Sequence, residues 1–264
     1  MEILVCVKQV PDDSVEIHLK NGDPDFSQAA PVVNAFDTYA LEMAVRLKEA
    51  VDGTVTVLSI GPESAKNSLK NCLAVGASKA FLVSEEDYEH LDAKGIGEVL
   101  KGAIEKIETQ EGVKFDVVFC GRESTDYALG QVGSVLAEEL GVGVIQNIVD
   151  IEKVEGNIVA KQETEEGYRQ VETAIPCVVT VNKPTYDPRY PTIKSKMAAR
   201  KITINEFSLA DVGKEKETLL LENSVKVVKV YEPAKKAAGV KIKAESVEDA
   251  VAQAFSLMEE AKVL

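Results

Sequence analysis

Apolar and polar residues alternate in blocks that predict strands and helices in turn over the first 140 residues. Continuously apolar runs at residues 2–8, 54–60 and 116–120 are typical of buried strands, because strands covered on both faces carry few polar residues. Between the first two runs, apolar residues at helical spacing predict a helix over residues 34–50. This alternation favours an α/β fold, a Rossmann-like open parallel sheet with helices on both faces.

The remaining elements follow from the same patterns. Further helices are expected at residues 64–74 and 95–106, and one that follows residue 121 and ends near 140. Further strands are expected at residues 79–83, 158–162, 168–173 and 176–181. The strands at 158–162 and 168–173 alternate in polarity, which is typical of antiparallel or edge strands.

The pattern changes after residue 201. Polar loops are followed by a strand-like stretch at 224–230, a linker at 233–239 and an amphipathic helix at 247–261. The sequence therefore predicts an α/β domain at residues 1–201 and a C-terminal arm at residues 202–264.

Composition narrows the class of protein. The chain has 264 residues, of which 45% are hydrophobic and 28% charged, so a soluble protein without a membrane span is expected. The start of the chain reads as a buried strand and not as a signal peptide, which favours the cytoplasm. A formal net charge of −14 disfavours nucleic acid as a partner. The scattered Cys6, Cys72, Cys120 and Cys177 are expected to be reduced core residues.

One segment departs from this acidic background. Residues 177–201 carry six basic side chains and a single acid, Asp187. Prolines and two tyrosines in the same stretch exclude an ordinary helix or central strand around residues 186–191. A rigid, basic, aromatic loop is typical of an interaction element, and a solvated connector is the alternative.

Residues 121–132, GRESTDYALGQV, form the first candidate site. They begin where a buried strand ends, which is where open α/β sheets bind nucleotides. Gly121 permits a close turn, and residues 124–126 are expected to cap the following helix, whose free N–H groups suit a phosphate. Glu123 and Asp126 would repel a phosphate, so we expect them to cap the helix or to face a ribose or a base.

Asn34 and Asp37 form the second candidate site, and two interpretations remain open. Their spacing is that of a capping box at a helix start. Alternatively, this helix start faces the same crevice as residues 121–132, with the strand ends at residues 6–8 and 59–61 as the floor.

Common catalytic motifs are missing from the sequence. The pair Gly95 and Gly97 lacks the third glycine and the preceding strand of a dinucleotide fingerprint, and no phosphate-binding loop of the GxxxxGK[ST] type occurs. His18 and His90 lie in polar segments and belong to no recognisable ligand or catalytic motif, so they are expected to be surface histidines without a metal. Any redox chemistry must therefore be carried by a bound cofactor.

Several stretches match, in order, the characteristic segments of one known family. They are VCVKQVPD, NAFDTYALEMAVRLKE, GPESAKNSLKNCLAVGASKAFLV, GRESTDYALGQVGSVLAEELG, PCVVTVNKPTYDPRYPTIKSKMAARK and AAGVKIKAESVEDAVAQAF. Through them the chain resembles the β subunit of the electron transfer flavoproteins over essentially its full length. The resemblance implies an adenine-nucleotide-hydrolase-like fold and an electron carrier built as a heterodimer with a larger α subunit that binds one FAD.

The resemblance also implies a nucleotide in the β crevice. Ordinary members hold AMP there, and electron-bifurcating members hold a second FAD that accepts hydride from NADH. The matching crevice residues are Cys6, Asn34, Ala35, Phe36, Asp37, Ile60, Gly121, Arg122, Glu123, Ser124, Thr125, Asp126, Tyr127, Ala128, Leu129, Gly130, Gln131 and Val132. No catalytic residue is implied.

A docking segment at residues 182–201 is implied as well, through which such subunits recognise acyl-CoA dehydrogenases. The docking residues are Tyr190, Ile193, Lys194, Lys196 and Met197. An apolar side chain ringed by lysine and arginine suits fast, weak docking to an acidic rim. The arm at residues 202–264 is expected to contact the α subunit.

The chain departs from the family pattern at two places. The crevice loop lacks the usual second acid and carries the bulkier Tyr127 and Leu129. A less acidic loop suits a pyrophosphate, which favours FAD over AMP. The docking segment reads Thr-Tyr-Asp-Pro at residues 185–188, where many members have a longer motif, so a stable enoyl-CoA reductase-type partner is also expected.

Three functions follow from these observations. The first is an electron-bifurcating carrier that oxidises NADH at a β-bound FAD. The second is a one-FAD carrier whose β subunit binds AMP and serves as scaffold and docking module. The third is a stand-alone nucleotide-binding protein of the stress-protein type, which the long arm and the basic segment disfavour.

Overall fold

The structure is a computed structural model that describes residues 1–234 and 239–263. The chain forms two compact units, Met1–Lys229 and Val230–Leu264, which are described separately. The first unit extends beyond the boundary expected after Lys201. It does so because residues 205–207 add a strand to the sheet and α6 (Lys216–Leu221) buries Leu219 in the core.

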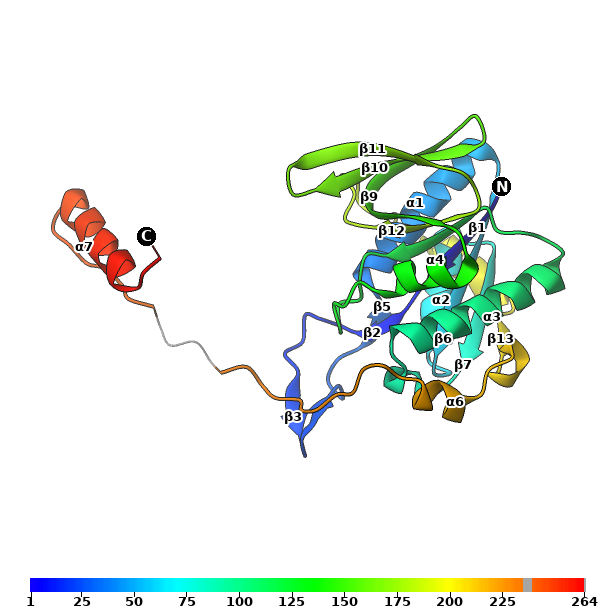
Figure 1. The fold of residues 1–264 in the computed structure, drawn as a ribbon, viewed down its shortest axis with the longest axis horizontal. Coiled ribbons are helices and arrows are strands. Elements are labelled where there is room, and N and C mark those ends of the chain that lie inside the picture. The colour runs from blue at the N-terminus through cyan, green and yellow to red at the C-terminus, as the bar shows by residue number, and fades with distance from the viewer. Residues whose placement is uncertain (235–238, 264) are drawn as a thin grey trace. The chain divides into compact units, whose positions relative to one another are not determined.

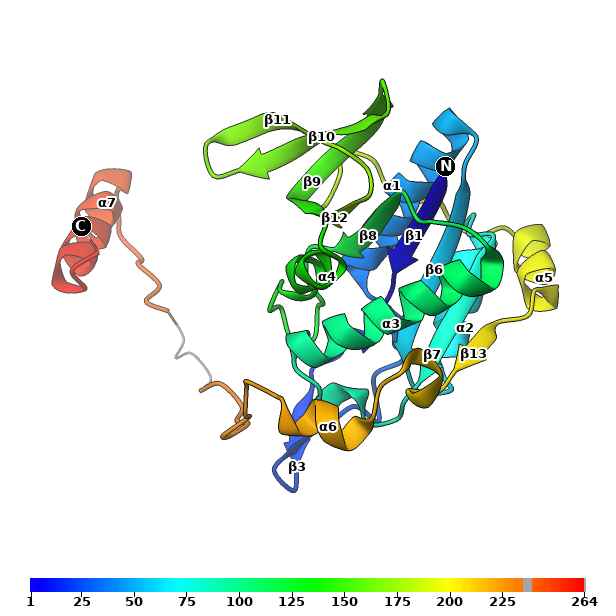
Figure 2. The same cartoon turned by 45° about the vertical axis from the view of Figure 1, so that its right-hand side comes forward.

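Within the described residues, the first unit is built on a sheet of nine strands (Figures 1 and 2). In sheet order they are β11 (Gly167–Thr173), β10 (Asn157–Thr164), β9 (Gly143–Val154), β12 (Cys177–Val181), β8 (Val117–Gly121), β1 (Glu2–Cys6), β6 (Thr54–Gly61), β7 (Lys79–Ser84) and β13 (Asn205–Phe207). The strands from β9 to β13 in this order are parallel, and β10 and β11 extend the sheet in antiparallel fashion. The expected α/β fold with a mostly parallel sheet is confirmed.

Helices cover both faces of the sheet. The helices α1 (Ala35–Val51) and α2 (Ala65–Ala74) pack on one face, and α3 (Ala93–Glu111) and α4 (Val132–Leu140) pack on the other, as Figure 2 shows. Successive strand side chains point to opposite faces, so β1 sends Ile3 and Val5 into the first core and Leu4 and Cys6 into the second. Burial on both faces explains why these strands are continuously apolar.

Small elements occupy the connections. The pair β2 (Gln9–Pro11) and β5 (Pro31–Val33) and the hairpin of β3 (His18–Lys20) and β4 (Asp23–Asp25) lie between β1 and α1. The short helices η1 (Tyr88–His90) and η2 (Ala210–Val212) lie in later connections.

Some elements differ from the sequence-based expectations. The pattern did not predict β9, because only a few of its side chains are buried and they follow no simple alternation. The prediction of a strand at residues 224–230 is wrong, because those residues form no strand and Val225, Val227 and Val228 are exposed. A valine-rich run becomes a strand only where a neighbouring strand satisfies its backbone groups.

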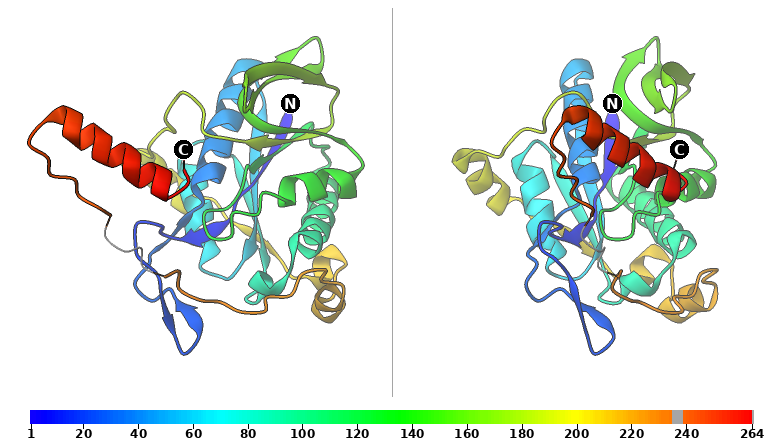
Figure 3. Two further views of the ribbon diagram at one scale, coloured as in Figure 1. Left: turned by 60° about the vertical axis from the view of Figure 1, so that its left-hand side comes forward. Right: turned by 90° about the vertical axis from the view of Figure 1, so that its left-hand side faces the viewer.

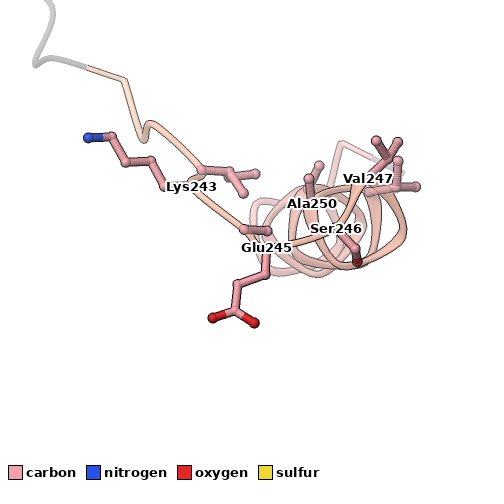
Figure 4. A pocket seen from close by; sticks show the side chains of 9 residues that line it. Lys243, Glu245, Ser246, Val247 and Ala250 are labelled. Carbon is pink, nitrogen blue, oxygen red and sulfur yellow. The ribbon is translucent and has the colours of Figure 1, made fainter.

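The second unit contains the helix α7 (Val247–Glu260), which confirms the helix expected near the C-terminus. Ser246 caps it by accepting the N–H of Asp249 at 3.1 Å. The residues before α7 pass beside its first turns (Figure 4). Together with the helix they border an open hollow of about 620 Å³, lined in part by Lys243, Val247 and Val251. Residues 235–238 of the expected linker lie outside the described residues.

In the described part of the chain, no helix is both long enough and apolar enough to cross a membrane.

Candidate nucleotide-binding crevice

The candidate nucleotide site lies at the edge of the sheet where the order in which the chain adds strands changes direction. β8, β1 and β6 are neighbouring parallel strands, so their carboxyl ends share one edge. The chain leaves β1 toward α1 on one face and leaves β8 toward α4 on the other. Adjacent strands whose connections leave on opposite faces form a topological switch point, the usual ligand position in open α/β sheets.

Asn34 joins the start of α1 to the loop that follows β8. Its buried side chain donates an N–H to the carbonyl of Glu123 at 2.8 Å and accepts the N–H of Thr125 at 3.2 Å. The capping-box interpretation is wrong, because the Asn34 side chain makes no cap bond to α1. The start of α1 and the loop do meet at one site, as the other interpretation requires.

Asp37 fixes the ends of two strands beneath the same loop. Its carboxylate accepts the backbone N–H of Lys8 at 2.7 Å and that of Gly121 at 3.1 Å. Burial raises the pKa of Asp37 to about 7, although the hydrogen bonds from these backbone groups favour the ionised form and lower it. Both carboxylate oxygens are therefore engaged in holding the two strand ends together.

The loop at residues 122–131 separates β8 from α4, which begins only at Val132. The expectation that Ser124, Thr125 or Asp126 caps this helix is wrong, because its N-cap residue is Gln131 and makes no side-chain cap bond. Thr125 N–H is bound by Asn34, and the other two residues lie well before the helix start. The helix end thus remains open to a ligand.

Backbone groups at the start of α4 fit a phosphate. In the described structure, the N–H groups of Gln131, Val132 and Gly133 have no protein acceptor, as expected for the first turn of a helix. Such groups bind anions, and the helix dipole adds to the attraction. Gly133 lets this turn lie against β12, because a Cβ there would collide with Thr180. Glycine is also required at position 121, because a Cβ there would collide with the Asp37 carboxylate.

Lys8 lies in the strand end at residues 6–8 that was expected at the crevice floor, but its side chain was not among the predicted nucleotide-binding residues. Its ammonium nitrogen lies 2.5 Å from the Asp126 carboxylate and 4.6 Å from the centre of the Tyr127 ring. Asp126 therefore neither caps a helix nor stands unopposed. The available signal was its position: Lys8 follows the first strand, at the edge where the loop was expected.

The remaining predicted crevice residues divide into buried and exposed groups. Cys6 and Ile60 are buried in the core beneath the crevice, and Phe36 would contact any Cβ at position 121. A hydrogen bond with the Cys120 thiol and burial raise the pKa of the Cys6 thiol well above its ordinary value. The exposed group is Ala35, Arg122, Tyr127, Ala128, Leu129, Gly130 and Gln131.

All four cysteines are buried and free, as the scattered positions predicted.

The expected docking segment is a helix in its second half and not a loop. α5 (Ile193–Lys201) begins with a capping box between Thr192 and Ser195. Its end is held by Lys70 of α2, whose ammonium group donates to the carbonyls of Ala199 at 3.1 Å and Arg200 at 3.3 Å and also to Ile202. Figure 3 shows this helix, in olive-yellow, beside α2.

Four of the five predicted docking residues lie on α5, and Tyr190 lies just before it. Tyr190, Ile193 and Met197 are 90%, 82% and 60% exposed, and Lys194 and Lys196 are also exposed. We call these five residues the α5 patch. Apolar side chains of this size are seldom so exposed without a partner.

Arg189 differs from the other basic residues of the segment. Its guanidinium group contacts Glu42 at 2.9 Å and Glu49 at 2.6 Å, both on α1, and its backbone N–H donates to Glu42 at 3.0 Å. Arg46 also binds Glu42 and lies over the Tyr186 ring at 3.8 Å. These contacts anchor the segment to α1. Because Arg189 is occupied in this way, the positive charge that a partner could contact comes from the lysines and Arg200.

Comparison with known proteins gives consistent matches along the chain. A family model described as the electron transfer flavoprotein domain matches residues 27–212. The chain is 38% identical over 250 residues to the electron transfer flavoprotein subunit beta of Megasphaera elsdenii, covering 93% of this chain and 92% of the relative. It is 32% identical over 267 residues to the caffeyl-CoA reductase-Etf complex subunit CarD of Acetobacterium woodii, covering 100% of both. The corresponding subunit of Mycobacterium leprae is 37% identical over 248 residues, covering 91% of each chain.

Proposed function

Because this chain belongs to the family of electron transfer flavoprotein β subunits, we propose that it pairs with an α subunit and holds an adenine nucleotide in its own crevice. One observation carries the proposal: Asn34 and Asp37 join the start of α1 to the loop after β8 at the switch point of the sheet. Beside that junction the first turn of α4 presents N–H groups that suit a phosphate.

We favour FAD over AMP as the nucleotide. Lys8 adds a positive charge beside the loop, and unpaired N–H groups at Gln131, Val132 and Gly133 provide donors for more than one phosphate. Tyr127 and Leu129 of the loop are more than half exposed and offer apolar surface to a flat ring. A bound FAD would supply the hydride acceptor for NADH, while these residues bind and orient it.

The likeness to a subunit of a caffeyl-CoA reductase complex adds a second argument. That relative's name places it in an assembly with a reductase of a CoA thioester. We therefore propose an electron-bifurcating role in which the partner is an enoyl-CoA reductase-type or acyl-CoA dehydrogenase-type flavoprotein. The one-FAD carrier with AMP in the β crevice is the alternative, and the charge balance of the loop supports FAD.

The α5 patch is proposed as the contact with that partner. Tyr190, Ile193 and Met197 supply a central apolar surface, and Lys194 and Lys196 surround it with positive charge. Apolar anchors give most of the affinity of such contacts, and the charges raise the association rate.

The second unit is proposed to contact the α subunit. The helix α7 exposes Val247, Val251, Phe255 and Met258, which recur at helical spacing and form one apolar stripe. Such a stripe is typical of a helix that packs against another chain.

The nucleotide content of the purified heterodimer tests the proposal. Acid release and chromatography should give two FAD per heterodimer, and NADH should bleach the flavin spectrum. One FAD with one AMP, and no bleaching, would support the alternative instead. No nucleotide beyond the one held by the α subunit would contradict the proposed crevice.

A matched pair of variants ties this result to the crevice. Asn34→Ala removes both bonds to the loop, whereas Asn67→Ala removes an amide of the same kind from α2. We expect the first variant to lose the β-bound nucleotide and the second to retain it. Retention by both would show that the Asn34 junction does not support binding.

A further inference from the structure

Lys8 occupies a fixed position at the edge of the crevice. It follows β1, and its backbone N–H donates to the Asp37 carboxylate at 2.7 Å. The same carboxylate accepts the N–H of Gly121 at the end of β8. The main chain of Lys8 is therefore held at the switch point, and its side chain starts from a defined place.

The side chain of Lys8 extends to the crevice loop. Its ammonium nitrogen lies 2.5 Å from Oδ2 of Asp126, a residue 118 positions away in the sequence. It also lies 4.6 Å from the centre of the Tyr127 ring. The Lys8 side chain is 25% exposed and that of Asp126 is 16% exposed, so both charges are partly withdrawn from water. A small movement of Asp126 would free the ammonium group for another anion.

The charges around the loop make Lys8 important. Glu123 and Asp126 are acidic, and burial, followed by the charges of Glu89 and Asp126, raises the pKa of the Tyr127 phenol. Arg122 is the other cation of the loop, but its side chain is nearly half exposed and lies 3.9 Å from the Glu123 carboxylate. A phosphate that approaches the α4 N–H groups through this acidic surface needs a cation to offset the repulsion.

We propose that Lys8 is the cationic contact for the phosphate of the bound nucleotide and that Asp126 holds the ammonium group until the phosphate replaces it. This inference rests on the proposed function, because it requires a nucleotide in the crevice. The pyrophosphate of FAD carries one negative charge on each phosphate, and the phosphate monoester of AMP carries about −1.5 to −2, so either group competes well with a single carboxylate. Asp126 then turns toward solvent from an exposed loop position.

Adenosine and AMP separate this role from a structural one, because they differ only in the phosphate. The full chain, co-purified with its α subunit and freed of the β-bound nucleotide, is titrated with each compound by calorimetry. In the variant Lys8→Met we expect AMP to bind at least ~10-fold more weakly, which corresponds to ~1.4 kcal/mol, and adenosine to change less than ~2-fold. In Asp126→Asn we expect AMP to bind ~3-fold more tightly, because its competitor is neutral, and adenosine to be unchanged.

Lys79→Met is the matched control. Lys79 also lies 2.5 Å from a carboxylate, that of Glu111, but away from the crevice edge of the sheet. It should leave both titrations unchanged. Equal weakening of AMP and adenosine in Lys8→Met would overturn the inference and leave the proposed crevice intact. Weaker AMP binding in Asp126→Asn would overturn the exchange of partners, and a wild-type chain that binds neither compound would overturn the crevice itself.

Discussion

The crevice loop at residues 122–131 and the α5 patch are both fixed by bonds from distant residues, but in opposite ways. In the crevice, Asn34 and Asp37 are buried and hold the backbone directly under the candidate ligand position. At the patch, Arg189 and Lys70 hold the two ends of the segment, and the side chains between them remain exposed. The first arrangement suits a small ligand that needs fixed donors, and the second suits a protein partner that covers a surface.

The largest expected effect concerns the pH dependence of stability at the crevice. The pKa of Asp37 is about 7 in the folded chain, above the ordinary value of 3.8 that applies when the chain is unfolded. Between these values the folded chain binds a proton that the unfolded chain has lost. Asp37 therefore contributes stability that is complete below pH ~4 and is lost as the pH rises to ~7, on the order of 4 kcal/mol in total.

Urea unfolding of the wild type and of Asp37→Asn from pH 5 to pH 8 measures this contribution. The difference in unfolding free energy between the two should shift in favour of the variant as the pH rises. A difference that stays constant with pH would show that Asp37 does not titrate in this range. The acids with lowered pKa values, such as Glu49 beside Arg189, act below this window and do not mask the effect.

The anchor of the α5 patch gives the next largest effect. Glu42 is buried and binds both Arg46 and Arg189, so Glu42→Ala should lower the free energy of unfolding by about 3 kcal/mol. Glu42→Gln retains hydrogen-bond acceptance and should cost less. Urea unfolding gives both values. If the two variants were equally stable, the charge of Glu42 would not be what holds the segment to α1.

Lys70 holds the other end of the segment. Lys70→Met removes the donor to the last carbonyls of α5 and should cost about 1–2 kcal/mol. Hydrogen exchange should show faster opening of α5 with little change in the crevice loop. Equal acceleration in both regions would mean that the two are one cooperative unit and that the comparison above does not hold.

The smallest effect on stability is expected in the α5 patch, where a substitution should alter electron transfer but hardly alter the free energy of unfolding. Ile193→Ala should change the free energy of unfolding by less than about 0.5 kcal/mol, because the side chain is mostly exposed. Electron transfer to the partner should slow about tenfold.

Lys194→Glu together with Lys196→Glu should reduce the association rate and its salt dependence, while Lys20→Glu on the β3–β4 hairpin should not. Unchanged transfer and salt dependence in the patch variants would exclude this surface as the docking site.

The hydrophobic pattern predicted most elements of the first unit and both candidate regions. Helices such as α1 and buried strands such as β1 are specified locally, because their spacing decides which faces are apolar. The same pattern did not predict β9, and it predicted a strand at residues 224–230 where none forms. A strand depends on the neighbour that binds its backbone, and that neighbour is distant in the sequence.

The sequence by itself determined the α/β class, the switch-point loop, the buried cysteines and the basic segment, because each depends on residue type and local spacing. Only the tertiary structure decided what individual polar residues do. In the structure, Asn34 binds the loop and does not cap the helix, Lys8 pairs with Asp126, and Arg189 binds the buried Glu42. Hydrogen bonds and ion pairs join residues that are brought together only by the packing of the sheet and its helices, so local spacing does not determine them.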